Sequence, residues 1–270
     1  MFKIISSDFM RLKKDTLFWL CIAVMFIFGL VGSISMYIDK KEAGDFCAEN
    51  VAFGFPMLSG ILCGVFCGMF QGEEFSEGTI RNKIISGHKR RDIYISQVLV
   101  CISAGLLMCI AYIIPSLIIG MVFMGGFQEL SNIEVIGYYL TGLLQISVCV
   151  TLFSLIITSV QKKTLGIALC FLVAIIIMYV SIDIHNCLVV PEYTYMFDSG
   201  TMEYGKNPRY PDDNERRILT LIFEILPAGQ AYQLCYRFAE NIVYMISGDI
   251  ILCIIFVLSG MSVFSRKDLK

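Results

Sequence analysis

Charged side chains gather in one short segment, residues 70–96, which lies between two long apolar runs. Its carboxylates come first and its cations come last. The leading acids are Glu73, Glu74 and Glu77, and the bases that follow them are Arg81, Lys83, Lys89, Arg90 and Arg91. Acidic residues near the start of a helix and basic residues near its end interact favourably with the helix dipole, so this order favours a short helix.

Two glycines and one charge pair refine this prediction. Gly78 and Gly87 predict a turn, a short helix and a second turn. Glu77 and Arg81 stand four residues apart, which is close enough on a helix for an ion pair. A short polar helix between two apolar runs offers a docking surface to a cytoplasmic partner. A solvated loop is the alternative interpretation.

The cysteines do not have the pattern of a metal site. Eight of the eleven fall within apolar runs, where a cysteine acts as a small hydrophobic residue. Cys63 and Cys67 lie one helical turn apart, but their run holds no histidine or acid that could complete a site. Outside the runs one disulfide could form, and we favour the pair Cys187 and Cys235. We expect no metal site.

Catalytic motifs are not found either. Residues 200–207 come close to a phosphate-binding loop, but Asn207 stands where Ser or Thr would hold magnesium, and no strand precedes them. An intramembrane protease would need acids and histidines within the runs, whereas His88 and His185 lie at or beyond the ends of runs. Charged residues within the runs are nearly absent, which argues against an ion-coupled carrier with a buried proton relay. We expect no catalytic residue and no nucleotide site, so any ATP is used by another subunit.

The composition indicates a polytopic membrane protein. The chain has 270 residues, of which 57% are hydrophobic and 16% charged, with a mean hydropathy of +0.73. A soluble domain carries roughly a quarter charged residues. Six apolar runs are candidate spans: residues 17–38, 51–71, 93–124, 135–160, 164–183 and 246–265. Each is long enough to cross a bilayer, provided that the last begins before Asp249 or tilts less.

Amphipathic segments accompany these runs. Residues 1–15 place Phe2, Ile5, Phe9 and Leu12 at helical spacing, as in a helix that lies in the membrane interface. Residues 184–245 begin as a loop and continue as two apolar helices, which would form a lid, a re-entrant hairpin or a packed cap. The predicted fold is a single all-α domain with six transmembrane helices, an interfacial N-terminal helix and a short helix within residues 72–92.

The distribution of charge predicts the orientation. If both termini, residues 72–92 and the link at 162–163 face the cytoplasm, that side holds 14 basic residues and the other side holds 7. The acidic residues divide in the opposite sense, 7 and 16. Because cytoplasmic loops of membrane proteins carry an excess of Lys and Arg, we expect both termini in the cytoplasm and residues 184–245 outside.

A glycine ridge marks the second run. Its members are Gly60, Gly64, Gly68 and Gly72, at every fourth residue. Four glycines in register give one helix face that another backbone can approach closely. The ridge would either pack helices within one subunit or line a narrow translocation path, with the bulky side chains of Phe55, Phe66 and Phe70 around it.

Taken together, these features resemble the ABC-2 type membrane subunits of ABC exporters. The resemblance rests on the interfacial helix, the six spans, and the stretch from Phe75 to Arg90 with its Glu-Gly-Thr-Ile-Arg and Ser-Gly-His-Lys sequences. It extends to the outer helices with Leu226-Pro-Ala-Gly-Gln. In that family the segment after the second span is the coupling helix, which docks on an ATP-binding subunit.

The resemblance places a coupling site on this chain. It comprises Glu77, Gly78, Thr79, Arg81, Lys83, Gly87 and Arg90. Charged contacts at Glu73, Glu74, Arg81 and Lys83 would let two states of the transporter differ in free energy when the ATP-binding subunits close. ATP and magnesium would then belong to the partner subunit, and this chain would need no cofactor of its own.

The resemblance also implies a function and partners. Two membrane subunits, expected to be a homodimer, and two ATP-binding subunits would form an exporter in the bacterial plasma membrane, with no nucleic-acid partner. The spans are apolar and aromatic, which suits a hydrophobic or amphipathic cargo, and small members of this family resemble exporters of amphipathic peptides or bacteriocin-immunity permeases. Export of a glycan, a lipid or a drug is the alternative. A membrane sensor or immunity protein that binds a peptide without transporting it is a further one.

Overall fold

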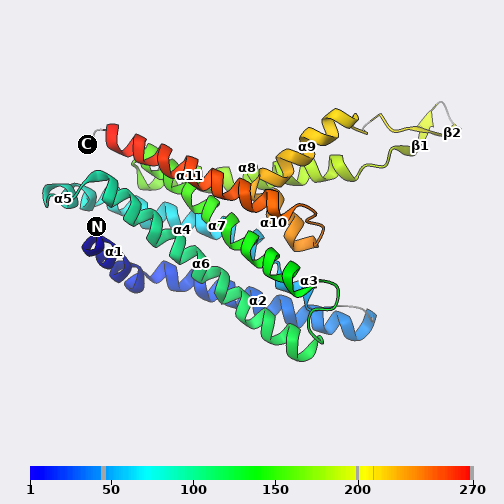
Figure 1. Ribbon diagram of the computed structural model, residues 1–270, viewed down its shortest axis with the longest axis horizontal. Coiled ribbons are helices and arrows are strands. Elements are labelled where there is room, and N and C mark those ends of the chain that lie inside the picture. Colours follow the sequence, from blue (N-terminus) through cyan, green and yellow to red (C-terminus); the bar gives the residue numbers. More distant parts are fainter. Residues whose placement is uncertain (44–46, 199–200, 209, 268–270) are drawn as a thin grey trace.

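The computed structural model describes residues 1–43, 47–198, 201–208 and 210–267. Six of its helices are long and apolar enough to cross a membrane. They are α2 (Thr16–Ala43), α4 (Phe55–Ser76), α6 (Arg90–Phe123), α7 (Asn132–Val160), α8 (Lys163–Val189) and α11 (Ile242–Arg266). These helices lie side by side in one bundle (Figure 1). The prediction of an all-α polytopic fold with six spans is confirmed.

The two ends of the bundle carry different short elements. The N-terminus and the last turns of α11 lie at one end, with α1 (Phe2–Lys14) and α5 (Thr79–Ile85), and we call this the terminal end (Figure 1). The opposite end, which we call the far end, carries α3 (Glu49–Ala52), α9 (Asp213–Ile225), α10 (Pro227–Tyr236) and a two-stranded sheet. An even number of spans returns the chain to the end at which it began.

Helix α1 is amphipathic, as predicted, but its buried face differs from the predicted one. Its buried residues are Ile4, Asp8 and Leu12, whereas Phe2 is 90% exposed. α1 packs against α6. Asp15 follows the last residue of α1, and its carboxylate accepts a hydrogen bond of 2.9 Å from the amide of Phe18, which caps the start of α2. The charged side chain of Asp8 therefore lies inside the contact between α1 and α6.

The three phenylalanines of α4 lie in the core of the bundle. Phe55, Phe66 and Phe70 are each at most 1% exposed and belong to one apolar cluster. Phe55 stacks on Tyr139 of α7, with ring centroids 6.1 Å apart. In this conformation the three side chains pack within one subunit. Their predicted place around a translocation path stays a prediction.

The glycine ridge of α4 is a close-packing surface. A Cβ atom on Gly68 would lie 2.9 Å from the Cα of Ile167 in α8, and one on Gly72 would lie 3.0 Å from the Cα of Lys163. Toward the far end, Gly64 faces the ring of Phe153 in α7. The ridge thus allows the α4 and α8 backbones to approach each other, which is the packing interpretation of the two left open above.

We expect Gly68→Ala to lower the free energy of unfolding by about 1 kcal/mol. Forcing a methyl group against a backbone atom costs about 1–3 kcal/mol, and the better helix propensity of alanine offsets about 1 kcal/mol of this. Gly32→Ala in α2 is the matched control, because a Cβ there meets nothing within 4 Å. Thermal unfolding in detergent should separate the two variants in opposite directions, and equal stabilisation of both would contradict the close contact.

The far end departs from the prediction in two respects. α8 continues to Val189 rather than ending near residue 183. The following residues, predicted as a loop, form an antiparallel hairpin of β1 (Tyr193–Asp198) and β2 (Thr201–Lys206), with Tyr193 stacked on Tyr204. In the sequence of β1 an aromatic residue stands at every second position (Tyr193, Tyr195 and Phe197), but the neighbouring Pro and Gly residues favoured a loop.

The two helices predicted after this hairpin are present. α9 and α10 meet at a bend of 90° at Leu226. α10 packs against α4, α7 and α8, and its Ala231 and Leu234 are buried, whereas Ile218 and Leu221 of α9 remain exposed. Cys187 and Cys235 are both free thiols. The disulfide is not formed in the structure and stays a prediction.

Candidate functional site

The segment between α4 and α6 forms a turn, a short helix and a second turn, as the glycines predicted. α4 ends at Ser76, and Gly78 adopts a left-handed conformation with φ +69°. α5 follows at once, and a second left-handed glycine, Gly87 with φ +88°, leads into α6. Glycine adopts positive φ without the steric penalty of other residues, so these two positions fix the direction of α5.

α5 has an exposed face and a buried face. Arg81, Asn82 and Ile85 are exposed, and the Ile85 side chain is 75% accessible. Ile80, at 2%, packs with Ile93 and other apolar residues beneath the helix. An exposed apolar side chain beside an exposed arginine is a combination found in protein interfaces.

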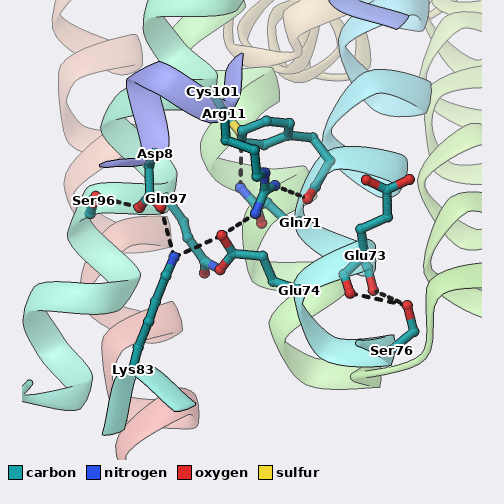
Figure 2. A network of polar contacts seen from close by, with 12 residues as sticks. Asp8, Arg11, Gln71, Glu73, Glu74, Ser76, Lys83, Ser96, Gln97 and Cys101 are labelled. Atoms are coloured by element: carbon teal, nitrogen blue, oxygen red, sulfur yellow. Dashed lines mark hydrogen bonds and ion pairs between the residues drawn. The ribbon is translucent and has the colours of Figure 1, made fainter. Parts of the chain in front are cut away.

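The buried face of α5 is fastened to two other helices by charge. Lys83 Nζ lies 2.7 Å from Asp8 Oδ1 of α1 and 2.7 Å from Glu74 Oε1 of α4 (Figure 2). The carboxylate side chains of Asp8 and Glu74 are only 3% and 2% exposed. Removed from water, an ion pair is stable only when its geometry is good and its remaining oxygen atoms are hydrogen-bonded.

Helix α6 supplies those remaining hydrogen bonds. Ser96 Oγ donates to Asp8 Oδ2 at 2.6 Å, and Gln97 Nε2 donates to Glu74 Oε2 at 2.5 Å. Each buried carboxylate therefore has partners on both oxygen atoms. We call Asp8, Glu74, Lys83, Ser96 and Gln97, together with Arg11, the terminal-end network (Figure 2).

Arg11 supplies the second positive charge of the network. It forms an ion pair with Glu74 and donates a hydrogen bond to the carbonyl oxygen of Phe70. Its guanidinium also lies 3.7 Å above the centre of the Phe70 ring, a cation–π contact. The network thus holds two carboxylates and two cations, so that its charges balance inside the helix contact.

The remaining charged residues of the segment have separate roles. Glu73 pairs with Lys163 at the start of α8, at 2.7 Å and partly exposed. Arg90 donates to the carbonyl oxygen of Lys267, at 2.7 Å, and so caps the end of α11. The expected ion pair of Glu77 with Arg81 is not formed among the described residues, because Glu77 is the C-cap of α4 and Arg81 belongs to the next helix.

A hollow adjoins the exposed part of the segment. It has a volume of about 460 Å³ and lies between the α4–α5 turn and the link from α7 to α8. Gly78 and Arg81 line one side, and Gln161 and Lys162 line the other. The hollow is large enough to receive side chains of a partner protein.

Apart from Glu73 and Arg90, whose contacts lie elsewhere, the predicted coupling residues divide into two groups. Glu77, Gly78, Thr79, Arg81 and Gly87 lie on or beside the outer surface of the turn and α5. Glu74 and Lys83 lie beneath it, in the terminal-end network. Sequence analysis missed Asp8 and Arg11, although their spacing of three residues places them on one helix face. It also missed Gln97, a polar residue near the start of an apolar run.

Comparison with known proteins places this geometry in a family. The model of a family described as ABC-2 family transporter protein matches residues 4–188, which run from α1 into the end of α8 and include the whole terminal-end network. No curated protein matches the chain significantly. The match covers more than half of the chain, and six membrane-spanning helices agree with it. The chain belongs to the ABC-2 transporter family and is a multi-pass membrane subunit of an ABC transporter.

Proposed function

We propose that this chain is the membrane subunit of an ATP-driven exporter and that the exposed face of α5 docks on a separate ATP-binding subunit. The observation that carries the proposal is the two-sided construction of α5. One face presents Arg81 and Ile85 to the surroundings, and the other is joined through Lys83 to two further helices. A docking helix that transmits force needs both properties.

The terminal-end network would transmit the movement. A push on α5 would act through Lys83 on Asp8 of α1 and Glu74 of α4 at the same time, while Gln97 ties α6 to the same carboxylate. These helices would then tilt together. The two states of the transporter must differ in such contacts if ATP-driven closure of the partner is to shift their equilibrium.

ATP and magnesium would bind to the partner subunit. ABC-2 family permeases act together with ATP-binding subunits, and the sequence of this chain supplied no nucleotide motif. The terminal end would face the cytoplasm, as the positive charges of its loops favour. In this proposal the protein is not an enzyme by itself, and it resides in the plasma membrane of a bacterium.

The cargo proposed is a hydrophobic or amphipathic peptide. Toward the far end a cavity of about 40 Å³ lies between α4, α7, α8 and α10, with Met57, Leu152 and Met178 among its apolar lining residues. Its small size suits a closed state. α8 exposes Phe171, Ile176 and Tyr179, which a second copy of the chain would cover in a homodimer, and the path would run along that contact.

The proposal is tested by co-expression with the candidate ATP-binding subunit. We expect Ile85→Asp and Glu77→Arg to abolish co-purification, or to abolish the stimulation of ATP hydrolysis by an amphipathic peptide. Gly78→Trp should do the same, because a bulky residue would be strained at positive φ. Glu240→Arg, a charge reversal at an exposed far-end acid, is the matched control.

Each outcome selects between functions. Normal pairing and turnover in all three variants would contradict the docking surface on α5. Intact coupling without a peptide response would move the cargo to a glycan, a lipid or a drug. Peptide binding without ATP-dependent movement of the peptide across sealed vesicles would favour a sensor or immunity protein.

A further inference from the structure

A carboxylate is buried without a protein partner in the far half of α11. Asp249 is 0% exposed, and it lies about two turns after the start of that helix at Ile242. Neither of its oxygen atoms accepts a hydrogen bond of normal geometry from a described residue. None of the ion pairs within the described part of the chain includes it. This separates Asp249 from the carboxylates of the terminal-end network, which are fully paired.

The side chain beside Asp249 offers it no positive charge. Gln230 of α10 is also 0% exposed and lies next to the Asp249 carboxylate. Its amide nitrogen donates to the carbonyl oxygen of Glu224 at 2.9 Å, and its second N–H is a weak neutral donor toward Asp249, whose oxygen atoms lack a hydrogen bond of normal geometry. The Oε1 of Gln230 has no donor among the described residues. Two buried side chains from two helices therefore bring together three oxygen acceptors, the two of Asp249 and Oε1 of Gln230, with one weak neutral donor and no positive charge.

No cation of the neighbouring helices pairs with Asp249 in the described part of the chain, although Arg216 and Arg217 of α9 line a hollow beside Gly248. α7 presents Cys149 and Thr151, with Cys109 of α6 behind Cys149. One turn further along α11 lies Cys253. α9 presents Glu224, whose carboxylate already accepts a hydrogen bond of 2.8 Å from Asn241. The titratable groups that interact with Asp249 across this contact are thus thiols.

An ionised carboxylate in a membrane-spanning segment requires a positive partner, because water and counter-ions are scarce there. Oxygen acceptors without a donor are suited to a cation. The cavity of about 40 Å³ nearby is lined by Gln145 and Cys149 but not by Asp249, so no larger group has room to reach the carboxylate in this conformation. The ligand must be small.

We propose that Asp249 and Gln230 form a binding site for one monovalent cation, a proton or an alkali-metal ion, at the contact of α10 with α11. The site goes beyond the docking function, since it lies at the opposite end of the bundle. Because α10 supplies one of its two side chains, any movement of α10 away from α11 would open the site and release the cation. By linkage, the bound cation favours the packed position of α10.

The test uses the full-length protein in lipid nanodiscs without the ATP-binding subunit, so its result is independent of the docking proposal. Two measurements distinguish the two cations. Infrared absorption reports whether a protonated carboxylic acid is present. Thermal unfolding in sodium or potassium chloride, compared with choline chloride, reports binding of an alkali-metal ion. Asp249→Asn removes the charge, and Asp183→Asn, an exposed acid of α8, is the matched control.

We expect one of two results. A carboxylic-acid band that is lost in Asp249→Asn and retained in Asp183→Asn would identify a proton. A rise of the melting temperature specific to sodium or potassium, and lost only in Asp249→Asn, would identify a metal ion. An ionised Asp249 without a cation-specific rise would overturn the proposal. Should Asp249→Asn fail to fold, Gln230→Leu serves instead, and an unchanged band together with an unchanged salt response would equally overturn it.

Discussion

Lys83→Met should lower the free energy of unfolding by roughly 3–5 kcal/mol, the cost of breaking a buried ion pair by removing one partner. The substitution keeps most of the apolar stem but leaves Asp8 and Glu74 without the ammonium group that lies 2.7 Å from each. Arg11 can still pair with Glu74. Asp8 keeps only the hydroxyl of Ser96, so its negative charge stays buried and uncompensated.

Thermal unfolding with a thiol-reactive dye measures this effect in the intact membrane protein. Seven cysteines are buried and become reactive only on unfolding. Lys89→Met, which removes an exposed lysine of the same segment, is the control and should change stability by a few tenths of a kcal/mol. If both variants melt alike, the network does not bear on stability.

A triple variant separates charge from shape. Asp8→Asn, Glu74→Gln and Lys83→Met together remove the uncompensated carboxylates, and replacing a complete buried ion network by neutral groups is often close to neutral for stability. We therefore expect this variant to regain most of the stability that Lys83→Met loses. It should nevertheless lose coupling to the ATP-binding subunit, because its helices are no longer joined by charge.

The sequence was sufficient to predict the spans because a single physical requirement, the transfer of a helix from water into lipid, determines where they lie. Each span must satisfy its backbone hydrogen bonds internally and bury about 20 apolar residues in lipid. Runs such as 135–160 therefore coincide closely with α7, which begins at Asn132. The turn, helix and turn around α5 were also predictable, since Gly78 and Gly87 adopt the positive φ angles that glycine permits.

The terminal-end network could not be predicted in the same way. Hydrophobic periodicity assigns charged residues to the exposed face of a helix, whereas Asp8 lies inward between Ile4 and Leu12 on the same face. The inward position is stable only because Lys83 and Ser96, distant in sequence, meet it there. Such compensation between helices carries no local signal.

Asp249 was underestimated for a related reason. One acid within a long apolar run changes the mean hydropathy of that run very little, so the run is still predicted as a span. The acid then affects only where the span is taken to begin. Whether Asp249 is paired or unpaired depends on the side chains that α7 and α10 place next to it. Burial without a partner is a property of the assembled helices, and the sequence of α11 alone does not contain it.

The second large effect is expected at the far end, where Gly229→Ala should displace α10. A Cβ on Gly229 would lie 2.2 Å from the carbonyl oxygen of Phe223 and 3.1 Å from its carbonyl carbon. These atoms belong to the backbone of α9 and cannot yield as a flexible side chain would. The bend of 90° between α9 and α10 must therefore open. We expect a loss of about 3 kcal/mol, at the upper end of the range for overpacking.

Cys235 on α10 reports the displacement directly. Burial raises the pKa of its thiol, which keeps the reactive thiolate scarce and makes labelling slow in the wild-type protein. In Gly229→Ala we expect faster labelling of Cys235 in a variant whose Cys47 and Cys187 are replaced by serine. Gly248→Ala in α11, where a Cβ meets nothing within 4 Å, is the control. Unchanged labelling would mean that α9 and α10 move as one rigid cap, whereas faster labelling would mean that α10 can leave its packed position at α4, α7 and α8, as an outer gate must.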